Sequence, residues 1–131
     1  MTGLDTNVLV RYLTQDDPAQ ALKATQVIED AAEQGELLYI TSIVLCEMVW
    51  VLDAAYGHSK QEIQAVLERI LRTAQFRFDH KDQLWRALQD YREGRADFSD
   101  YLIGYLGAHN GCQETVTFDK ALGNHAAFRL L

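Results

Sequence analysis

The sequence predicts an α/β fold: one domain over residues 1–131, with a short parallel sheet of four to five strands and helices on both faces. Short apolar segments of strand type alternate with longer segments of helical periodicity, an order typical of parallel sheets. Two of these strands end at an Asp, which places polar groups at strand ends. A length of 131 residues with 48% hydrophobic side chains is enough for one buried core.

Each element has its own local signal. Pro18 in a first turn and Gly35 after a last turn bound one helix, and Ser59 with Glu62 has the spacing of a capping box. Thr41 or Ser42 is expected to cap the third helix, and Asp79 the fifth. Strands are expected near residues 2–4, 37–40, 76–78, 114–118 and 128–131. Helices are expected near residues 8–13, 18–34, 42–55, 59–71, 79–93 and 99–108.

The charge and cysteine content restrict the possible partners and location. A net charge of -7 argues against a long, high-affinity nucleic-acid groove, but bound cations reverse the local sign at an acidic site. No apolar run has transmembrane length and no secretory signal is visible. Cys46 and Cys112 fit reduced thiols, with a disulfide between them as the open alternative. We therefore expect a cytoplasmic protein without a membrane segment.

Five acidic residues stand where they could form a site. Asp5 and Asp119 each close a predicted strand, and ligand sites in parallel sheets lie at such carboxyl ends. Glu47 interrupts an apolar helical stretch, and buried carboxylates need compensation. Asp97 and Asp100 lie three residues apart at a helix start, on one face. Turns, helix caps or an ion pair would explain each acid alone, but they explain the whole set less well.

A cluster of these carboxylates predicts metal-assisted chemistry. Several negative charges in one cleft repel one another unless cations are present. Oxygen ligands without suitable His or Cys spacing favour Mg²⁺ or Mn²⁺ over zinc. Such ions bind substrate phosphate and lower the pKa of a bound water, so phosphodiester hydrolysis is the natural reaction. Whether one or two ions act stays open.

Four ordered blocks resemble a known family. They are Gly3 to Leu13, then Ser42 with Glu47, then Ala96 to Ile103, and finally Thr117 to Lys120. Together they cover nearly the whole chain and resemble the PIN-domain ribonucleases, closely the VapC-type toxins of toxin–antitoxin pairs. The resemblance implies a three-layer PIN-like fold.

The same resemblance assigns roles to single residues. It implies that Asp5, Glu47, Asp100 and Asp119 hold the metal, with Asp97 a further acid that could exchange roles with Asp100. Supporting polar residues would be Thr6, Asn7 and Thr117. It also implies hydrolysis of RNA that leaves a 5′-phosphate and a 3′-hydroxyl. The implied partners are a small antitoxin, which lays a helix and an extended tail in a groove, and a second copy in a homodimer.

Other interpretations compete with a toxin. A phosphoacceptor receiver domain would need paired acids after the first strand, where Asp5 stands alone. A PIN nuclease of RNA processing and a non-catalytic PIN-fold scaffold both stay open. A scaffold would keep its partner interactions and lose nothing measurable in Asp5→Asn, whereas an enzyme would lose activity. A processing nuclease would have no coding sequence for a short antitoxin next to its own gene.

Several other side chains are expected to be structural. Trp50, Tyr56 and Trp85 are expected in the core, and the four histidines lack metal-ligand spacing. Arg11 and Lys120 flank the acids and could contact phosphate or form ion pairs.

Overall fold

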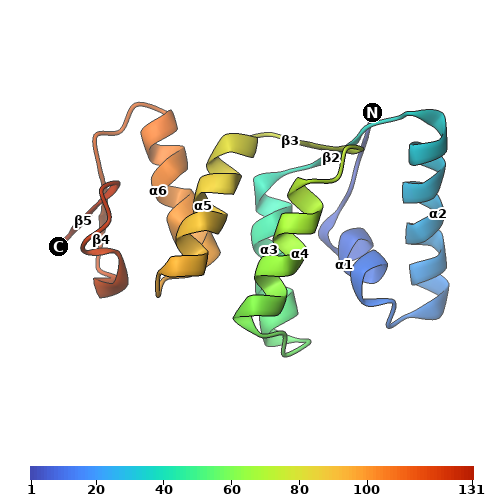
Figure 1. The fold of residues 1–131 in the computed structure, drawn as a ribbon, viewed down its shortest axis with the longest axis horizontal. Helices are drawn as coiled ribbons and strands as arrows, with labels where there is room; N and C mark the ends of the chain where they lie inside the picture. Colours follow the sequence, from blue (N-terminus) through green and yellow to red (C-terminus); the bar gives the residue numbers. More distant parts are fainter. The chain divides into compact units, whose positions relative to one another are not determined.

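The computed structural model describes residues 1–131 as two compact units, Met1–Asp79 and His80–Leu131, here called the N-terminal and C-terminal units. Each unit combines helices with parallel strands (Figure 1). This confirms an α/β fold. None of the helices has both the length and the apolar character that a membrane span requires.

A three-stranded parallel sheet organises the N-terminal unit. Its strands are β1 (Thr2–Gly3), β2 (Leu38–Ile40) and β3 (Phe76–Phe78), in the order β1-β2-β3. The first and last residues of β2 and of β3 are buried while the middle residues are not, so each strand turns alternate side chains to the core.

Four helices complete this unit: α1 (Thr6–Thr14), α2 (Pro18–Gln34), α3 (Ser42–Ala54) and α4 (Lys60–Leu71). Their predicted ends are confirmed. Asp17 caps α2 and Thr41 caps α3, each by accepting a backbone N–H, and Gly35 ends α2 in a left-handed conformation at φ 66°. Ser59 and Glu62 form the predicted capping box of α4.

The C-terminal unit contains α5 (Lys81–Glu93), α6 (Phe98–His109), β4 (Thr115–Thr117), the 3₁₀ turn η1 (Lys120–Leu122) and β5 (Phe128–Leu130). Helices α5 and α6 pack side by side (Figure 1), and Leu84, Leu88 and Phe98 are fully buried. Strands β4 and β5 pair in parallel. Gly104 of α6 lies against Phe128, since a Cβ there would come within 2.5 Å of its Cε2.

The structure corrects the predicted sheet and one predicted cap. The strands form a sheet of three and a sheet of two, not one sheet of four to five. Asp79 does not cap α5, whose N-cap is His80; its carboxylate binds the start of α3 instead. The short η1 turn was not predicted.

Candidate functional site

The carboxyl edge of the three-stranded sheet carries polar residues on each strand. Gly3 pairs with Tyr39 and Ile40 with Phe78, so Asp5, Thr41 and Asp79 leave adjacent strands close to the same level. This is the edge at which parallel α/β sheets bind ligands.

Asp5 stands at the N-cap position of α1 without capping it. Its backbone is extended, at φ -80° and ψ 161°, but its carboxylate accepts no hydrogen bond from the helix. The caps of α2, α3 and α4 all accept such a bond. Asp5 is exposed, so its charge is free for another partner.

Thr6 and Asn7 follow Asp5 in the first turn of α1. Thr6 is 5% exposed, and its Oγ1 is buried without a hydrogen-bond partner. An unpaired buried hydroxyl is unfavourable and calls for an explanation. Asn7 is exposed.

Asp79 fixes the start of α3, a role that the sequence analysis missed. The backbone N–H of Ser42 donates to both carboxylate oxygens of Asp79, at 3.1 and 3.2 Å, and the Ser42 hydroxyl donates at 2.5 Å. A carboxylate at a helix N-terminus is also favoured by the helix dipole. The next acid along this helix is Glu47.

Glu47 lies on the solvent side of α3, which corrects the expectation of a buried carboxylate. Ile43 and Trp50 flank it at helical spacing and are both 71% exposed, so the prediction that Trp50 belongs to the core is wrong. Tyr56 and Trp85 are half-buried. On the inner side, burial and then the nearby Asp79 charge raise the pKa of the Cys46 thiol to about 11.

Three of the predicted acids lie in the C-terminal unit, and two of them are in contact. Asp97 is the N-cap of α6 and its backbone N–H donates to Asp100 Oδ2 at 3.1 Å, within a capping box. Burial raises the pKa of the Asp100 carboxyl; the hydrogen bond from Asp97 lowers it, and the charges of Asp97 and Asp119 raise it again. The charges of both other carboxylates therefore contribute to the raised pKa of Asp100.

Thr117 and Asp119 form a tight turn after β4. The N–H of Asp119 donates to Thr117 Oγ1 at 3.0 Å, and the Asp119 carboxylate accepts the N–H of Ala121 at 2.9 Å. Thr117 thus holds the backbone at Asp119, consistent with a supporting role.

The five acids are therefore placed as two in the N-terminal unit and three in the C-terminal unit. Asp5 lies at the sheet edge and Glu47 on α3, while Asp97 and Asp100 form the capping box at the start of α6 and Asp119 follows β4. Within either unit no three His, Cys, Asp or Glu side chains are arranged to hold a metal ion by themselves. Cys46 and Cys112 are both free thiols in the structure.

Two other polar networks serve the fold. His125 Nε2 donates to Asp90 at 2.7 Å while its Nδ1 accepts the N–H of Ala127 at 3.0 Å. Tyr105 donates to the same Asp90 carboxylate at 2.5 Å. Because both ring nitrogens are occupied, His125 has no free lone pair with which to act as a base.

Arg11 forms an ion pair with Asp16 at 3.3 Å and donates to Tyr56 at 2.8 Å. It thereby joins the end of α1 to the loop after α3 and is not paired with Asp5. Lys120 is exposed within η1.

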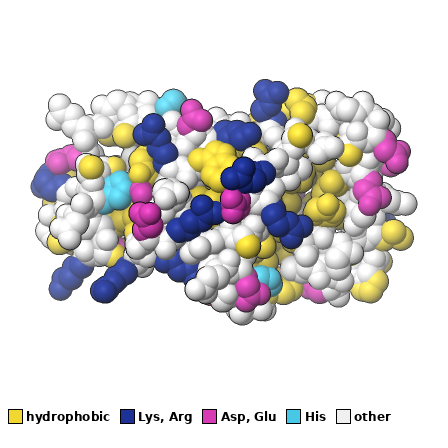
Figure 2. Space-filling view, viewed as in Figure 1, with side chains coloured by type: hydrophobic (Ala, Val, Ile, Leu, Met, Phe, Trp, Pro, Cys, Tyr) yellow, Lys and Arg dark blue, Asp and Glu magenta, His cyan; other side chains and the backbone are white.

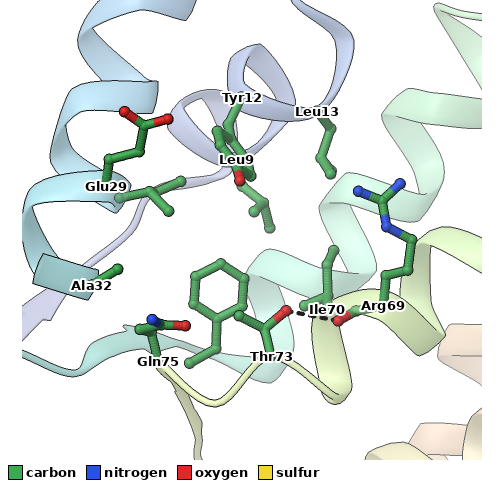
Figure 3. Close-up of a pocket in the computed structure, with 11 residues that line it drawn as sticks. Leu9, Tyr12, Leu13, Glu29, Ala32, Arg69, Ile70, Thr73 and Gln75 are labelled. Carbon is green, nitrogen blue, oxygen red and sulfur yellow. Dashed lines mark hydrogen bonds between the residues drawn. The ribbon is translucent and has the colours of Figure 1, made fainter. Parts of the chain in front are cut away.

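A pocket of about 200 Å³ lies among α1, α2 and α4 (Figure 3). Leu9, Leu13 and Ile70 give it apolar walls, and Glu29 and Arg69 stand on opposite sides. Figure 2 shows Lys and Arg interspersed with acidic and hydrophobic side chains, and hydrophobic ones reach the surface over α1 and α2.

The fold and the ordered acids define the class of the protein. The chain matches the PIN domain family model over residues 4–127, so it belongs to the PIN domain family. A particular relative is similar over most of its length: a VapC ribonuclease of Aquifex aeolicus (strain VF5) is 27% identical over 121 residues, covering 92% of this chain and 88% of the relative. The resemblance read from the four sequence blocks is thereby confirmed.

Proposed function

We propose that this protein is a metal-dependent endoribonuclease that acts as the toxin of a toxin–antitoxin pair. The observation that carries the proposal is the group of carboxylates around Asp100, whose pKa is raised by burial and by the charges of Asp97 and Asp119. Clustered acids with perturbed pKa values are typical of functional sites. Membership in the PIN family and the similarity to a VapC ribonuclease support the reaction.

We propose a single catalytic domain over residues 1–131. Its metal ligands would be Asp5, Glu47, Asp97, Asp100 and Asp119. Three observations fit a hard divalent cation such as Mg²⁺ or Mn²⁺: the donors are all carboxylates, Asp5 is not engaged by its own helix, and Thr6 Oγ1 beside it is an unpaired buried hydroxyl. When bound, such a cation supplies charge that binds substrate phosphate and activates water.

The rest of the chain positions these ligands. The bond between Asp79 and Ser42 fixes the start of the helix that carries Glu47. The capping box restrains Asp100, and Thr117 restrains the turn at Asp119. Catalysis needs ligands held in place before the substrate arrives, and these local bonds supply that order. Asn7 and Thr6 would orient the substrate or the carboxylate of Asp5.

The proposed partner is a small antitoxin protein that binds over the α1–α2 side of the N-terminal unit. Leu22 and Val27 of α2 are 62% and 42% exposed, and the pocket of Figure 3 has apolar walls. Exposed apolar surface of this kind marks protein contacts. We further propose a homodimer and a cytoplasmic location, for which the free thiols are suited.

The proposal is tested by cleavage of fluorescent single-stranded RNAs in Mg²⁺, Mn²⁺ or EDTA. We expect the wild type to cut in either metal, and Asp5→Asn and Asp100→Asn to lose at least about 100-fold in rate. Asp53→Asn is the matched control, because Asp53 is an exposed carboxylate near the far end of α3. Cleavage that survives EDTA or both site substitutions overturns the metal mechanism.

The role as a toxin needs a separate test. Expression of the wild type should arrest growth, Asp5→Asn should not, and a short protein encoded next to the gene should restore growth and inhibit cleavage. A nuclease that cuts RNA but arrests nothing belongs to RNA processing instead.

A further inference from the structure

Two exposed aromatic side chains lie beside two of the proposed catalytic acids. The chain has two Trp, six Tyr and five Phe residues, and among all of these only Trp50 and Phe118 are exposed. Trp50 is 71% exposed and Phe118 is 82% exposed. The sequence places Trp50 one helical turn after Glu47 and Phe118 directly before Asp119.

Trp50 shares the solvent face of α3 with Glu47. Positions three apart on a helix lie on one face, so the indole stands next to the carboxylate. The helix is anchored below by Leu45, Met48 and Leu52, all fully buried. Trp50 therefore projects from a rigid element and makes no part of the core.

Phe118 projects from a backbone that is fixed on both sides. Thr117 O accepts the N–H of Leu131 at 2.8 Å, and Thr117 Oγ1 accepts the N–H of Asp119 at 3.0 Å. Asp119 is held in turn by its bond to Ala121. The ring is thus presented to solvent by an ordered turn next to a proposed ligand.

We propose that Trp50 and Phe118 are two stacking platforms, each of which binds an unpaired base of the RNA substrate beside one of the proposed metal ligands. This inference rests on the proposed function. Aromatic side chains bind single-stranded RNA by stacking on splayed bases, whereas bases inside a duplex are not accessible to them.

The charge of the chain favours this kind of contact. With a net charge of -7, the protein has little excess of Lys and Arg for phosphate binding. Stacking does not depend on net charge, so it can supply affinity that the backbone contacts lack. Each platform also lies next to a proposed metal ligand of its own unit, Trp50 beside Glu47 and Phe118 beside Asp119.

The test compares steady-state cleavage of one RNA by Trp50→Ala, Phe118→Ala and the conservative Trp50→Phe. We expect KM to rise about tenfold for each Ala variant with little change in kcat, the typical size of a lost stacking contact. Trp50→Phe should retain most of the affinity. Val116→Ala is the matched control, since Val116 is 51% exposed two residues before Phe118.

Two further readouts separate stacking from a structural effect. Addition of RNA should quench tryptophan fluorescence in the wild type but not in Trp50→Phe, in which only the half-buried Trp85 emits. An RNA with abasic nucleotides next to the cut should raise the wild-type KM at least to the value of the Ala variants. It should raise the KM of each Ala variant by a smaller factor, because one stacking contact is already lost there. Pairing the same RNA in a duplex should abolish cleavage.

The outcomes distinguish a failure of the stacking inference from a failure of the proposed nuclease function. If the wild type cuts no RNA, the proposed function fails and the inference fails with it. If the wild type cuts RNA and the Ala variants keep its KM, the nuclease stands and the stacking platforms are wrong. Variants that lose only self-association or partner binding would assign these aromatics to a protein contact and overturn the inference.

Discussion

The carboxylate of Asp79 receives both the backbone N–H and the hydroxyl of Ser42, which lies 37 residues earlier in the chain. Asp79 directly follows β3 and Ser42 begins α3, so this contact ties the end of a strand to the start of a helix that precedes it in the chain. It joins the sheet to the helix that carries Glu47, and it satisfies backbone groups that a helix N-terminus leaves unpaired.

Asp79→Ala should destabilise the protein by about 1–3 kcal/mol. A charged acceptor is lost, and the N–H and hydroxyl of Ser42 are left partly buried without a hydrogen-bond partner. Ser42→Ala removes only the hydroxyl bond and should cost about 1 kcal/mol. Urea unfolding followed by circular dichroism measures both.

The control for this prediction lies at the other end of the same helix. Asp53 is near the C-terminus of α3, where a negative charge opposes the helix dipole, so Asp53→Asn should be neutral or slightly stabilising. Equal losses for Asp79→Ala and Asp53→Asn would show that the capping contact contributes nothing specific.

The two cysteines should differ in reactivity. Burial, with the charge of Asp79, raises the pKa of Cys46 from 9.0 to about 11, which lowers its thiolate fraction at pH 8 about 100-fold. Cys112 is exposed. Iodoacetamide at pH 8 should therefore alkylate Cys112 in the folded protein and reach Cys46 at a comparable rate only in urea. Mass spectrometry of the labelled peptides reads this out, and early labelling of Cys46 would contradict it.

The close packing of Gly104 against Phe128 predicts a strong effect of one methyl group. A Cβ at position 104 would lie 2.5 and 2.7 Å from ring atoms of the buried Phe128, and 3.2 Å from Ala127. Gly104→Ala should thus cost about 1–3 kcal/mol through overpacking, although Ala is the better helix former.

A double-mutant cycle identifies the cause. Phe128→Leu removes the ring atoms that clash, so the pair Gly104→Ala with Phe128→Leu should be more stable than the sum of the two single losses predicts. Strict additivity in urea unfolding would place the loss elsewhere in α6.

Much of the fold was predictable because the signals are local. The helix bounds Pro18 and Gly35, the capping box of Ser59 with Glu62, and the strand Phe76–Phe78 occur where the sequence indicated them. The partner of Asp79 was not predictable, because its bond to Ser42 depends on the pairing of β2 with β3. The division of five strands into two sheets depends on tertiary contacts in the same way.

The sequence predicted which residues belong to the candidate site, but it did not predict which neighbouring side chains are exposed around them. The spacing of Asp97 and Asp100 indicated one helical face, and the structure shows the capping box that the spacing allows. Trp50 was misassigned because nearly every residue from Ile43 to Leu52 is apolar, so periodicity does not reveal which side of α3 faces solvent.

The raised pKa of Asp100 predicts how stability depends on pH in the absence of metal. Because the pKa in the folded protein lies above its ordinary value, the folded state holds this proton more tightly than the unfolded chain. The contribution of Asp100 to stability is therefore fully present below its ordinary pKa and is lost as the pH rises through the raised folded-state value. At neutral pH the charged carboxylate opposes folding.

Asp100→Asn should accordingly stabilise the protein at pH 7 in EDTA, by less than about 1 kcal/mol because the side chain is only half-buried and solvent screens its charge. The amide oxygen can still accept the N–H of Asp97. At a pH below about 3.5, where Asp100 is protonated, the gain should vanish.

At neutral pH, Mg²⁺ should raise the unfolding midpoint of the wild type and leave that of Asp100→Asn unchanged, since a ligand that binds only the folded state stabilises it. A variant that is equally stabilised by Mg²⁺ would remove Asp100 from the proposed metal ligands, while its behaviour in EDTA tests the electrostatic argument separately.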